Sequence, residues 1–186
     1  MTSILPFDEL NAFNDQIRAQ FAQGVRLSKQ DDYEDILDEL LDLFLLSYAR
    51  ANEVTNAKLS SDWIPSIQDV METVNEKVAG KTWEERIKEW FDNGGTGDDI
   101  IRIAETESHR IANRSALDTA KKAGATKKTW VTMLDDRVRE THDYLEGVQV
   151  NIDDDFYTFD GSHAPAPGMF GIPEEDINCR CELLFS

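Results

Sequence analysis

The chain has 186 residues, of which 37 are acidic and 19 basic, so its formal net charge at pH 7 is −18. This length allows one domain or two small ones, and the charge disfavours nonspecific binding to nucleic acid or to an anionic membrane. The chain has only two cysteines, and it begins with neither the basic segment nor the apolar run of a signal peptide, so we expect a soluble protein with reduced thiols, made in a cytoplasm, without membrane spans.

Apolar residues at three- and four-residue spacing predict helices over most of the first two-thirds of the chain. The first covers Phe7 to Phe21 and ends near Gly24, and a second, with a wider apolar face, covers residues 33–48. Trp63-Ile64-Pro65 interrupts the pattern, which restarts over residues 67–78. Such apolar stripes are more typical of a protein core than of a cofactor pocket.

Capping motifs predict two further helices. Thr82 and Glu85 have the spacing of a capping box ahead of "TWEERIKEWF", which should stop at the Asn-Gly-Gly that follows. Thr96 and Asp99 repeat this spacing and begin a long helix that ends near Gly124.

The pattern changes near Lys128. There "KKTWVTML" alternates and predicts a strand, and "DDRVRETHDYLEG" predicts a short helix or turn ending at Gly147. "VQVNI", "FYTF" and "CELLF" predict short strands, and the Pro/Gly-rich "GSHAPAPGMFGIP" predicts a loop. The predicted fold class is therefore α+β, with a helical N-terminal region in residues 1–95 and a small, loop-rich α+β C-terminal domain with short antiparallel strands in residues 96–186.

Candidate metal ligands gather in the C-terminal third. If "NCRCELLF" is a strand, Cys179 and Cys181 point to the same side and their sulfurs can approach one point. Together with His142 and either Asp135 or His163, they could form the tetrahedral shell of a zinc ion (Zn²⁺). The alternative is that both cysteines are small buried hydrophobes and His142 is a hydrogen-bonded structural side chain. The residues alone favour this alternative, because one Cys-X-Cys and a distant histidine are a weak metal signal.

An ordered series of segments gives the chain a resemblance to a known family. The series is "IAETESHRIANRSA", "KKTWVTMLDDRVRETHDYLEG", "FYTF", a Pro/Gly loop and "INCRC". From about Ile103 to Cys181, the chain resembles the C-terminal domain of phage head morphogenesis proteins, the minor head proteins similar to phage Mu protein F. The residues that fall on these motifs are Glu105, Arg110, Asn113, Trp130, Asp135, Arg137, Arg139, His142, Gly147, Asn178, Cys179, Arg180 and Cys181.

The resemblance implies a minor capsid protein of a tailed bacteriophage, a structural virion component present in few copies near the portal vertex. Such a protein assists procapsid assembly and, in some relatives, DNA packaging or ejection. Its implied partners are the portal protein and the major coat or scaffold protein. It would be made in the cytoplasm of the bacterial host and would lie in the capsid interior or at the portal vertex, with Cys-Arg-Cys as the closing element of the domain.

The charge is unevenly distributed along the chain. Residues 1–100 carry 9 basic and 21 acidic side chains, a net charge of −12; residues 102–139 carry 9 and 5, a net charge of +4; and residues 140–186 carry 1 and 11, a net charge of −10. The acidic helices with wide apolar faces favour binding to portal or coat protein, or formation of a homo-oligomer. Residues 102–139 could contact packaged DNA only weakly, because the flanks repel phosphate. We expect Arg137 and Arg139 to anchor the C-terminal acidic loops instead.

No catalytic signature points to an enzyme, because the chain lacks a Gly-rich phosphate loop, His-Glu-X-X-His and G-X-S-X-G. The competing hypothesis is a metal-dependent hydrolase or nuclease, or a toxin-like effector, built from Asp135, His142 and the cysteine pair, in which a zinc ion activates water. A third hypothesis is a free-standing zinc-stabilised binding module.

Overall fold

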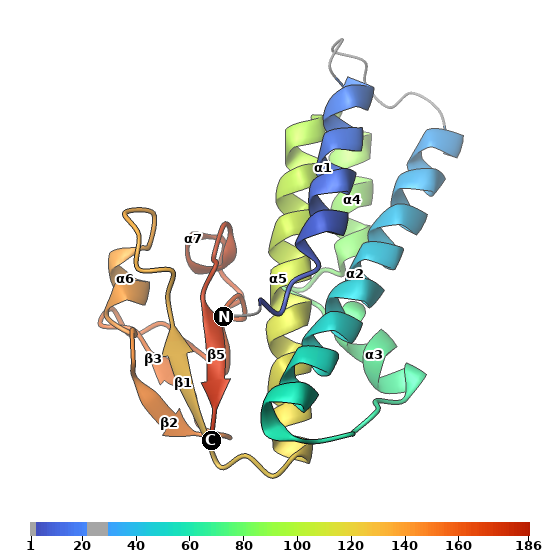
Figure 1. Cartoon of the computed structure of the whole chain (residues 1–186). Coiled ribbons are helices and arrows are strands. Elements are labelled where there is room, and N and C mark those ends of the chain that lie inside the picture. The colour runs from blue at the N-terminus through green and yellow to red at the C-terminus, as the bar shows by residue number, and fades with distance from the viewer. Residues whose placement is uncertain (1–2, 22–29) are drawn as a thin grey trace.

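The structure, a computed structural model, describes residues 3–21 and 30–186 (Figure 1). The helices that come first in the chain are α1 (Phe7–Phe21), α2 (Gln30–Leu59), α3 (Ile67–Val74), α4 (Trp83–Asp92) and α5 (Gly97–Lys122). They are followed by β1 (Lys127–Val131), α6 (Glu140–Asp143), β2 (Gln149–Asn151), β3 (Phe156–Tyr157), β4 (His163–Ala164), α7 (Pro173–Asp176) and β5 (Glu182–Phe185). This order confirms the predicted α+β class, with helices first and short antiparallel strands after them.

The helical part packs around one apolar core. Three- and four-residue spacing places the apolar side chains of each helix on one face, and these faces meet in the interior. Phe44 of α2 and Trp83 of α4 form an edge-to-face pair with ring centroids 5.2 Å apart. The buried members of this core are Leu10, Phe13, Ile17, Tyr33, Ile36, Leu40, Leu43, Phe44, Tyr48, Val74, Trp83, Ile87, Ile100, Ile101, Ala104 and Ile111.

Helix α5 lies between the helical part and the strands (Figure 1). It contacts α1, α2, α3 and α4, and it also contacts β5. Small side chains allow this close approach: Ala112 and Ala116 of α5 are buried in one cluster with Ala51 and Val54 of α2, and Phe185 of β5 packs against it. This arrangement makes α5 the element that both parts share.

The helix boundaries agree with the prediction except at the end of α3. Helix α1 covers the predicted residues, and its predicted end near Gly24 lies outside the described residues. Helix α2 covers the predicted residues 33–48 and continues to Leu59, ahead of the predicted interruption at Trp63-Ile64-Pro65. Helix α3 ends at Val74, so the prediction that it reaches Val78 is wrong; Val78 instead pairs with Lys81 in an isolated antiparallel bridge.

Side-chain caps fix the start of α4 and α5. The Thr82 hydroxyl accepts a hydrogen bond from the Glu85 N–H at 3.2 Å, and the Glu85 carboxylate accepts one from the Thr82 N–H at 2.8 Å. This confirms the predicted capping box. At α5, the Thr96 N–H and hydroxyl both donate to Asp99 Oδ2, each at 2.9 Å.

Two small antiparallel sheets form the C-terminal part. One has the strand order β2-β1-β5, with Lys128 opposite Val150 and Trp130 opposite Leu183, and the other pairs β3 with β4. Strand β4 lies in residues 161–173, which the sequence predicts as a loop, so that prediction is wrong there, and helix α7 begins at the last residue of this segment.

The C-terminal core surrounds Trp130, which is fully buried. Its indole ring makes edge-to-face contacts with His142 and Phe156, with centroids 5.3 and 5.2 Å away. The other buried members are Leu117, Leu145, Ala166, Cys179, Cys181 and Leu183. In the part of the chain that the structure describes, no helix is long and apolar enough to cross a membrane.

Candidate metal centre

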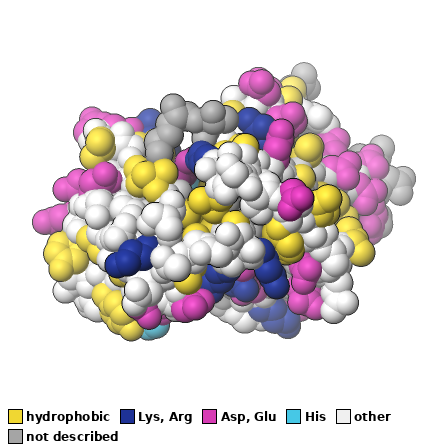
Figure 2. All heavy atoms as spheres, turned by 60° about the horizontal axis from the view of Figure 1, so that its bottom comes forward, with side chains coloured by type: hydrophobic (Ala, Val, Ile, Leu, Met, Phe, Trp, Pro, Cys, Tyr) yellow, Lys and Arg dark blue, Asp and Glu magenta, His cyan; other side chains and the backbone are white. Residues whose placement is uncertain are grey.

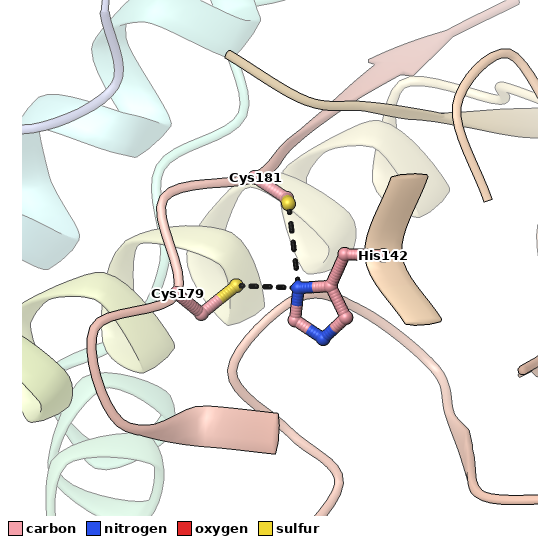
Figure 3. A group of neighbouring side chains, drawn as sticks. All are labelled: His142, Cys179 and Cys181. Carbon is pink, nitrogen blue, oxygen red and sulfur yellow. Dashed lines mark hydrogen bonds between the residues drawn. The ribbon is translucent and has the colours of Figure 1, made fainter. Parts of the chain in front are cut away.

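One imidazole and two thiols meet in the C-terminal core (Figure 3). Nδ1 of His142 lies 3.7 Å from Sγ of Cys179 and 3.6 Å from Sγ of Cys181. The three side chains are buried, and their donor atoms all lie within 4.8 Å of one another. The structure therefore brings together the three residues that the sequence singled out as the core of a metal shell.

The backbone around Asn178 directs the two thiols toward the same side of the chain, where His142 lies. Asn178 has a φ of +59°, in the left-handed region that asparagine tolerates better than most residues other than glycine. The prediction that the cysteines lie in a strand is wrong, since β5 begins at Glu182. The segment before β5 nevertheless alternates, with Cys179 and Cys181 buried and Arg180 partly exposed. Both sulfurs consequently point at the same ring nitrogen (Figure 3).

Helix α6 holds the imidazole in place. The backbone N–H of His142 donates to the backbone carbonyl of Arg139 at 3.0 Å. The guanidinium of Arg139 donates to the backbone carbonyl of Ile177. These bonds join the start of α6 to the segment that carries the cysteines. Arg139 thus anchors the end of the acidic segment 173–176 through a backbone carbonyl and not through a carboxylate.

A buried carboxylate lies on the far side of the imidazole. Oε2 of Glu175 is 2.9 Å from His142 Nε2, but the two atoms do not have the geometry of a hydrogen bond. The same oxygen accepts a hydrogen bond from the Thr141 hydroxyl at 2.9 Å. A carboxylate beside Nε2 favours the tautomer that carries its proton on Nε2. The Nδ1 lone pair of that tautomer faces the two sulfurs.

The other two predicted donors lie elsewhere. The carboxylate of Asp135 accepts two hydrogen bonds from the Arg180 guanidinium, at 2.8 and 2.6 Å, and these hold the pKa of Asp135 well below its usual range. His163 is exposed on the β3–β4 hairpin, with Nδ1 2.8 Å from Oδ2 of Asp155. Neither residue belongs to the group around His142.

The remaining motif residues have local structural contacts. Arg180, and not Arg137, makes the two-point pair with Asp135; the Arg137 side chain is 73% exposed and lies 3.5 Å from that carboxylate. Gly147 has a φ of +73°, and its N–H donates to the carbonyl of Trp130 at 2.9 Å, which attaches the turn between α6 and β2 to strand β1.

Sequence reasoning missed two residues beside the group, His109 and Glu175. His109 of α5 lies beside Cys179. The Asn113 amide faces Nε2 of His109 at 3.0 Å and donates to the carbonyl of Cys181 at 3.2 Å. The four-residue spacing of His109 and Asn113 could have indicated their shared helix face. Glu175 gave no such signal, because it lies in a stretch without periodicity.

The thiols also influence each other. A hydrogen bond between them raises the pKa of Cys179 and lowers that of Cys181. A cavity of about 10 Å³ adjoins both cysteines and His142. That volume is close to the space that one water molecule requires.

Comparison with known proteins gives a family match and two partial relatives. The family described as "Phage Mu protein F like protein" matches residues 49–184. The chain is 39% identical over 88 residues to NAD(+)--arginine ADP-ribosyltransferase EFV of Enterococcus faecalis (strain ATCC 700802 / V583), a match that covers 45% of this chain and 18% of that protein. It is 40% identical over 86 residues to Minor head protein GP7 of Bacillus phage SPP1, which covers 44% of this chain and 28% of GP7. The matched segments are thus less than a third of either relative, and no solved structure matches the chain.

Proposed function

The chain belongs to the Phage Mu protein F like family, and on this premise we propose that it is a minor head protein of a tailed bacteriophage. In this role it is a virion component, made in the host cytoplasm, that assists procapsid assembly near the portal. The observation that carries the proposal is the 40% identity to Minor head protein GP7 over 86 residues. DNA packaging and ejection are further steps in which such a component can take part.

The C-terminal part supports a structural role over a catalytic one. His142, Cys179 and Cys181 are 1, 6 and 3% exposed, and the cavity that adjoins them has a volume of about 10 Å³. A hydrolase or nuclease needs an open coordination position that a substrate can reach. This cavity accommodates one water molecule and no substrate.

The similarity to an ADP-ribosyltransferase raises an enzymatic alternative. The match covers only 18% of that protein, so most of it has no counterpart in this chain. A segment of almost the same length matches a minor head protein, which favours a module shared by two otherwise different proteins. We expect no transfer of ADP-ribose from NAD⁺ to arginine by the purified chain, and measurable transfer would favour the enzyme.

A groove at the N-terminal end offers a surface for a head protein. A cavity of about 740 Å³ lies between the start of the chain and α2. Phe7 and Leu46 line it and are 49 and 45% exposed, and Asp8, Glu9 and the ion pair of Glu53 with Arg50 surround them, so acids outnumber bases there. Exposed apolar side chains ringed by acids suit an apolar partner segment flanked by basic residues. The portal or coat protein is the proposed partner.

The basic stretch 102–139 supports no strong role in DNA binding. Within the described residues most of its cations have acidic partners, including Arg102 with Asp99 at 2.7 Å and Lys121 with Asp153 at 2.7 Å. Figure 2 shows dark blue side chains in small groups bordered by magenta acids and yellow hydrophobic side chains. The face in Figure 2 therefore has no continuous positive stripe of the kind that neutralises phosphates.

Co-purification tests this proposal. The full chain is mixed with purified portal, coat and scaffold proteins of the phage that encodes it, and complexes are separated by size. We expect wild type to bind one of them and Leu46→Asp to bind at least tenfold more weakly, while Ile64→Asp, at a position 83% exposed outside the groove, binds like wild type. Equal binding by Leu46→Asp would exclude the groove, and failure of wild type to bind any head protein would contradict the proposed function.

A further inference from the structure

We propose that His142, Cys179 and Cys181 bind one zinc ion through Nδ1 and two thiolates, with a water molecule as the fourth ligand. The ion joins α6 to the segment before β5. This inference concerns the chain's own residues and does not depend on its role in the phage head.

The distances across the site fit a tetrahedral ion. Zinc lies about 2.0–2.1 Å from histidine nitrogen and about 2.3 Å from thiolate sulfur. Two such bonds at a tetrahedral angle place nitrogen and sulfur roughly 3.6 Å apart. The two observed separations from His142 Nδ1 are 3.7 and 3.6 Å. Both sulfurs therefore lie at the distance from Nδ1 that two ligands of one zinc ion would have.

The direction of the thiols also favours a shared ion. A neutral imidazole has one acceptor nitrogen with one lone pair, so it can accept one well-aligned hydrogen bond there. Two sulfurs approach Nδ1 of His142 at nearly equal distance (Figure 3). One lone pair accepts a hydrogen bond from one thiol and leaves the other thiol to the neighbouring sulfur, which is a weak acceptor, whereas one ion between the three atoms would bond to all of them.

The side chains that contact the three ligands are of the kinds found in known zinc sites. Metal-bound histidines almost always present their other ring nitrogen to a carboxylate, carbonyl or water. Glu175 Oε2 lies 2.9 Å from Nε2 of His142, and both side chains are buried. The buried indole N–H of Trp130 has no hydrogen-bond partner among the described nitrogen and oxygen atoms, and it faces Cys181. A metal-bound thiolate would give this N–H an acceptor.

Water is the fourth ligand in this proposal, because no fourth described side chain joins His142, Cys179 and Cys181. Asp135 is engaged by Arg180, and His163 is paired with Asp155. His109 lies beside Cys179 but outside the group of mutually close donor atoms. The cavity of about 10 Å³ touches all three ligands and can hold one water molecule. The ion would then be four-coordinate with three protein ligands.

Metal content tests the site directly. The full chain is purified without chelator or added metal, saturated with Zn²⁺, freed of excess metal and analysed by mass spectrometry of the elements. We expect about one zinc per chain in wild type and in His163→Ala, and at least a tenfold lower content in His142→Ala, Cys179→Ser and Cys181→Ser. Wild type that retains less than a tenth of an equivalent would overturn the proposal, as would serine variants that retain as much zinc as wild type.

Cobalt spectroscopy of wild type covers the case in which these variants fail to fold. Co²⁺ in a tetrahedral site with two thiolates gives intense visible bands and a sulfur-to-cobalt charge-transfer band in the near ultraviolet. We expect these bands in wild type, their loss when one equivalent of Zn²⁺ is added, and no such charge-transfer band in any serine variant that folds. Wild type with only the weak bands of an octahedral, oxygen-bound ion would rule out thiolate ligation.

Discussion

At the scale of single residues, Lys128 shows how a buried cation is accommodated in the C-terminal part. Its side chain is 1% exposed, its ammonium donates to the carbonyl of Pro165 at 2.7 Å, and it lies 5.4 Å from the centre of the Phe156 ring. Burial lowers the pKa of Lys128 to about 8. The charged form therefore destabilises the folded state at neutral pH.

This environment predicts that stability depends on pH. Between the folded pKa of about 8 and the ordinary value of 10.5, the unfolded chain binds the proton at Lys128 and the folded chain does not. The free energy of unfolding should therefore rise with pH in this window, with a contribution of up to ~1.4 kcal/mol per pH unit. Urea unfolding at several pH values should show a smaller slope for Lys128→Met than for wild type. Lys127→Met, at an exposed neighbour, should keep the wild-type slope; equal slopes in all three proteins would contradict the assignment.

Asn178 offers a second test at this scale. Its φ of +59° suits glycine, and its side chain is exposed, so the residue matters through its backbone conformation. Asn178→Ala should lower the free energy of unfolding by about 1 kcal/mol, because alanine lacks the short polar side chain that lets asparagine adopt the left-handed region at a lower cost. Asn178→Gly should differ from wild type by a few tenths of a kcal/mol. If alanine proved as stable as glycine, the left-handed conformation would not be the reason for asparagine here.

The sequence predicted the three residues of the candidate centre but not its surroundings. Cysteine and histidine stand out because few other side chains share their chemistry, so His142, Cys179 and Cys181 could be selected without a structure. Glu175 could not, since an acidic residue in an acidic segment looks like a solvated charge. Its burial at 5% exposure depends on the packing of α7 against α6.

At the scale of elements, α5 carries a buried ionic network. The Arg110 guanidinium donates to Glu107 at 2.9 Å, to Glu76 at 3.0 Å and to the carbonyl of Thr73 at 3.0 Å. Glu107 is also 2.7 Å from the guanidinium of Arg86. The network joins α5 to α3 and α4, and it accounts for an arginine that is 2% exposed.

Removal of this arginine should destabilise the whole chain. Arg110→Met leaves the Glu107 carboxylate buried with one partner fewer, and loss of one member of a buried ion pair typically costs about 3–5 kcal/mol. Arg102→Met, on the same helix, removes a pair whose arginine is 49% exposed, and it should cost less than about 1 kcal/mol. Denaturant unfolding of both variants measures the difference. Equal costs would show that the network adds nothing to the stability of α5.

The long helices and strands β1, β2, β3 and β5 were predictable from the sequence, whereas strand β4 was not. The periodicity of α1 and the cap of α4 are local properties of the chain, so the sequence alone indicates them. Strand β4 has only two residues, and it exists because Ala164 pairs with Phe156 and His163 with Tyr157. Such pairs arise from the tertiary fold and leave no period in the sequence.

At the scale of the whole molecule, the family match begins at residue 49, within α2 and far before the motifs near Ile103. The second half of α2 packs against α5 through small side chains, and the Asn52 amide donates to the Thr119 hydroxyl at 2.9 Å. The Ser115 hydroxyl of α5 donates to the carbonyl of Tyr48 at 2.8 Å. The end of α2 therefore belongs to the same packing unit as the strands, although alanine contacts form no recognisable motif.

The measurement that tests the central claim most directly is the protein composition of purified phage heads. Heads are isolated from a lysate of the phage that encodes this chain and are compared by quantitative mass spectrometry with tails and with the soluble fraction. The account predicts that the chain is enriched in heads at a few copies relative to the coat protein, and that deletion of its gene lowers the yield of infectious particles. Absence of the chain from heads, together with normal particles after deletion of the gene, would contradict it.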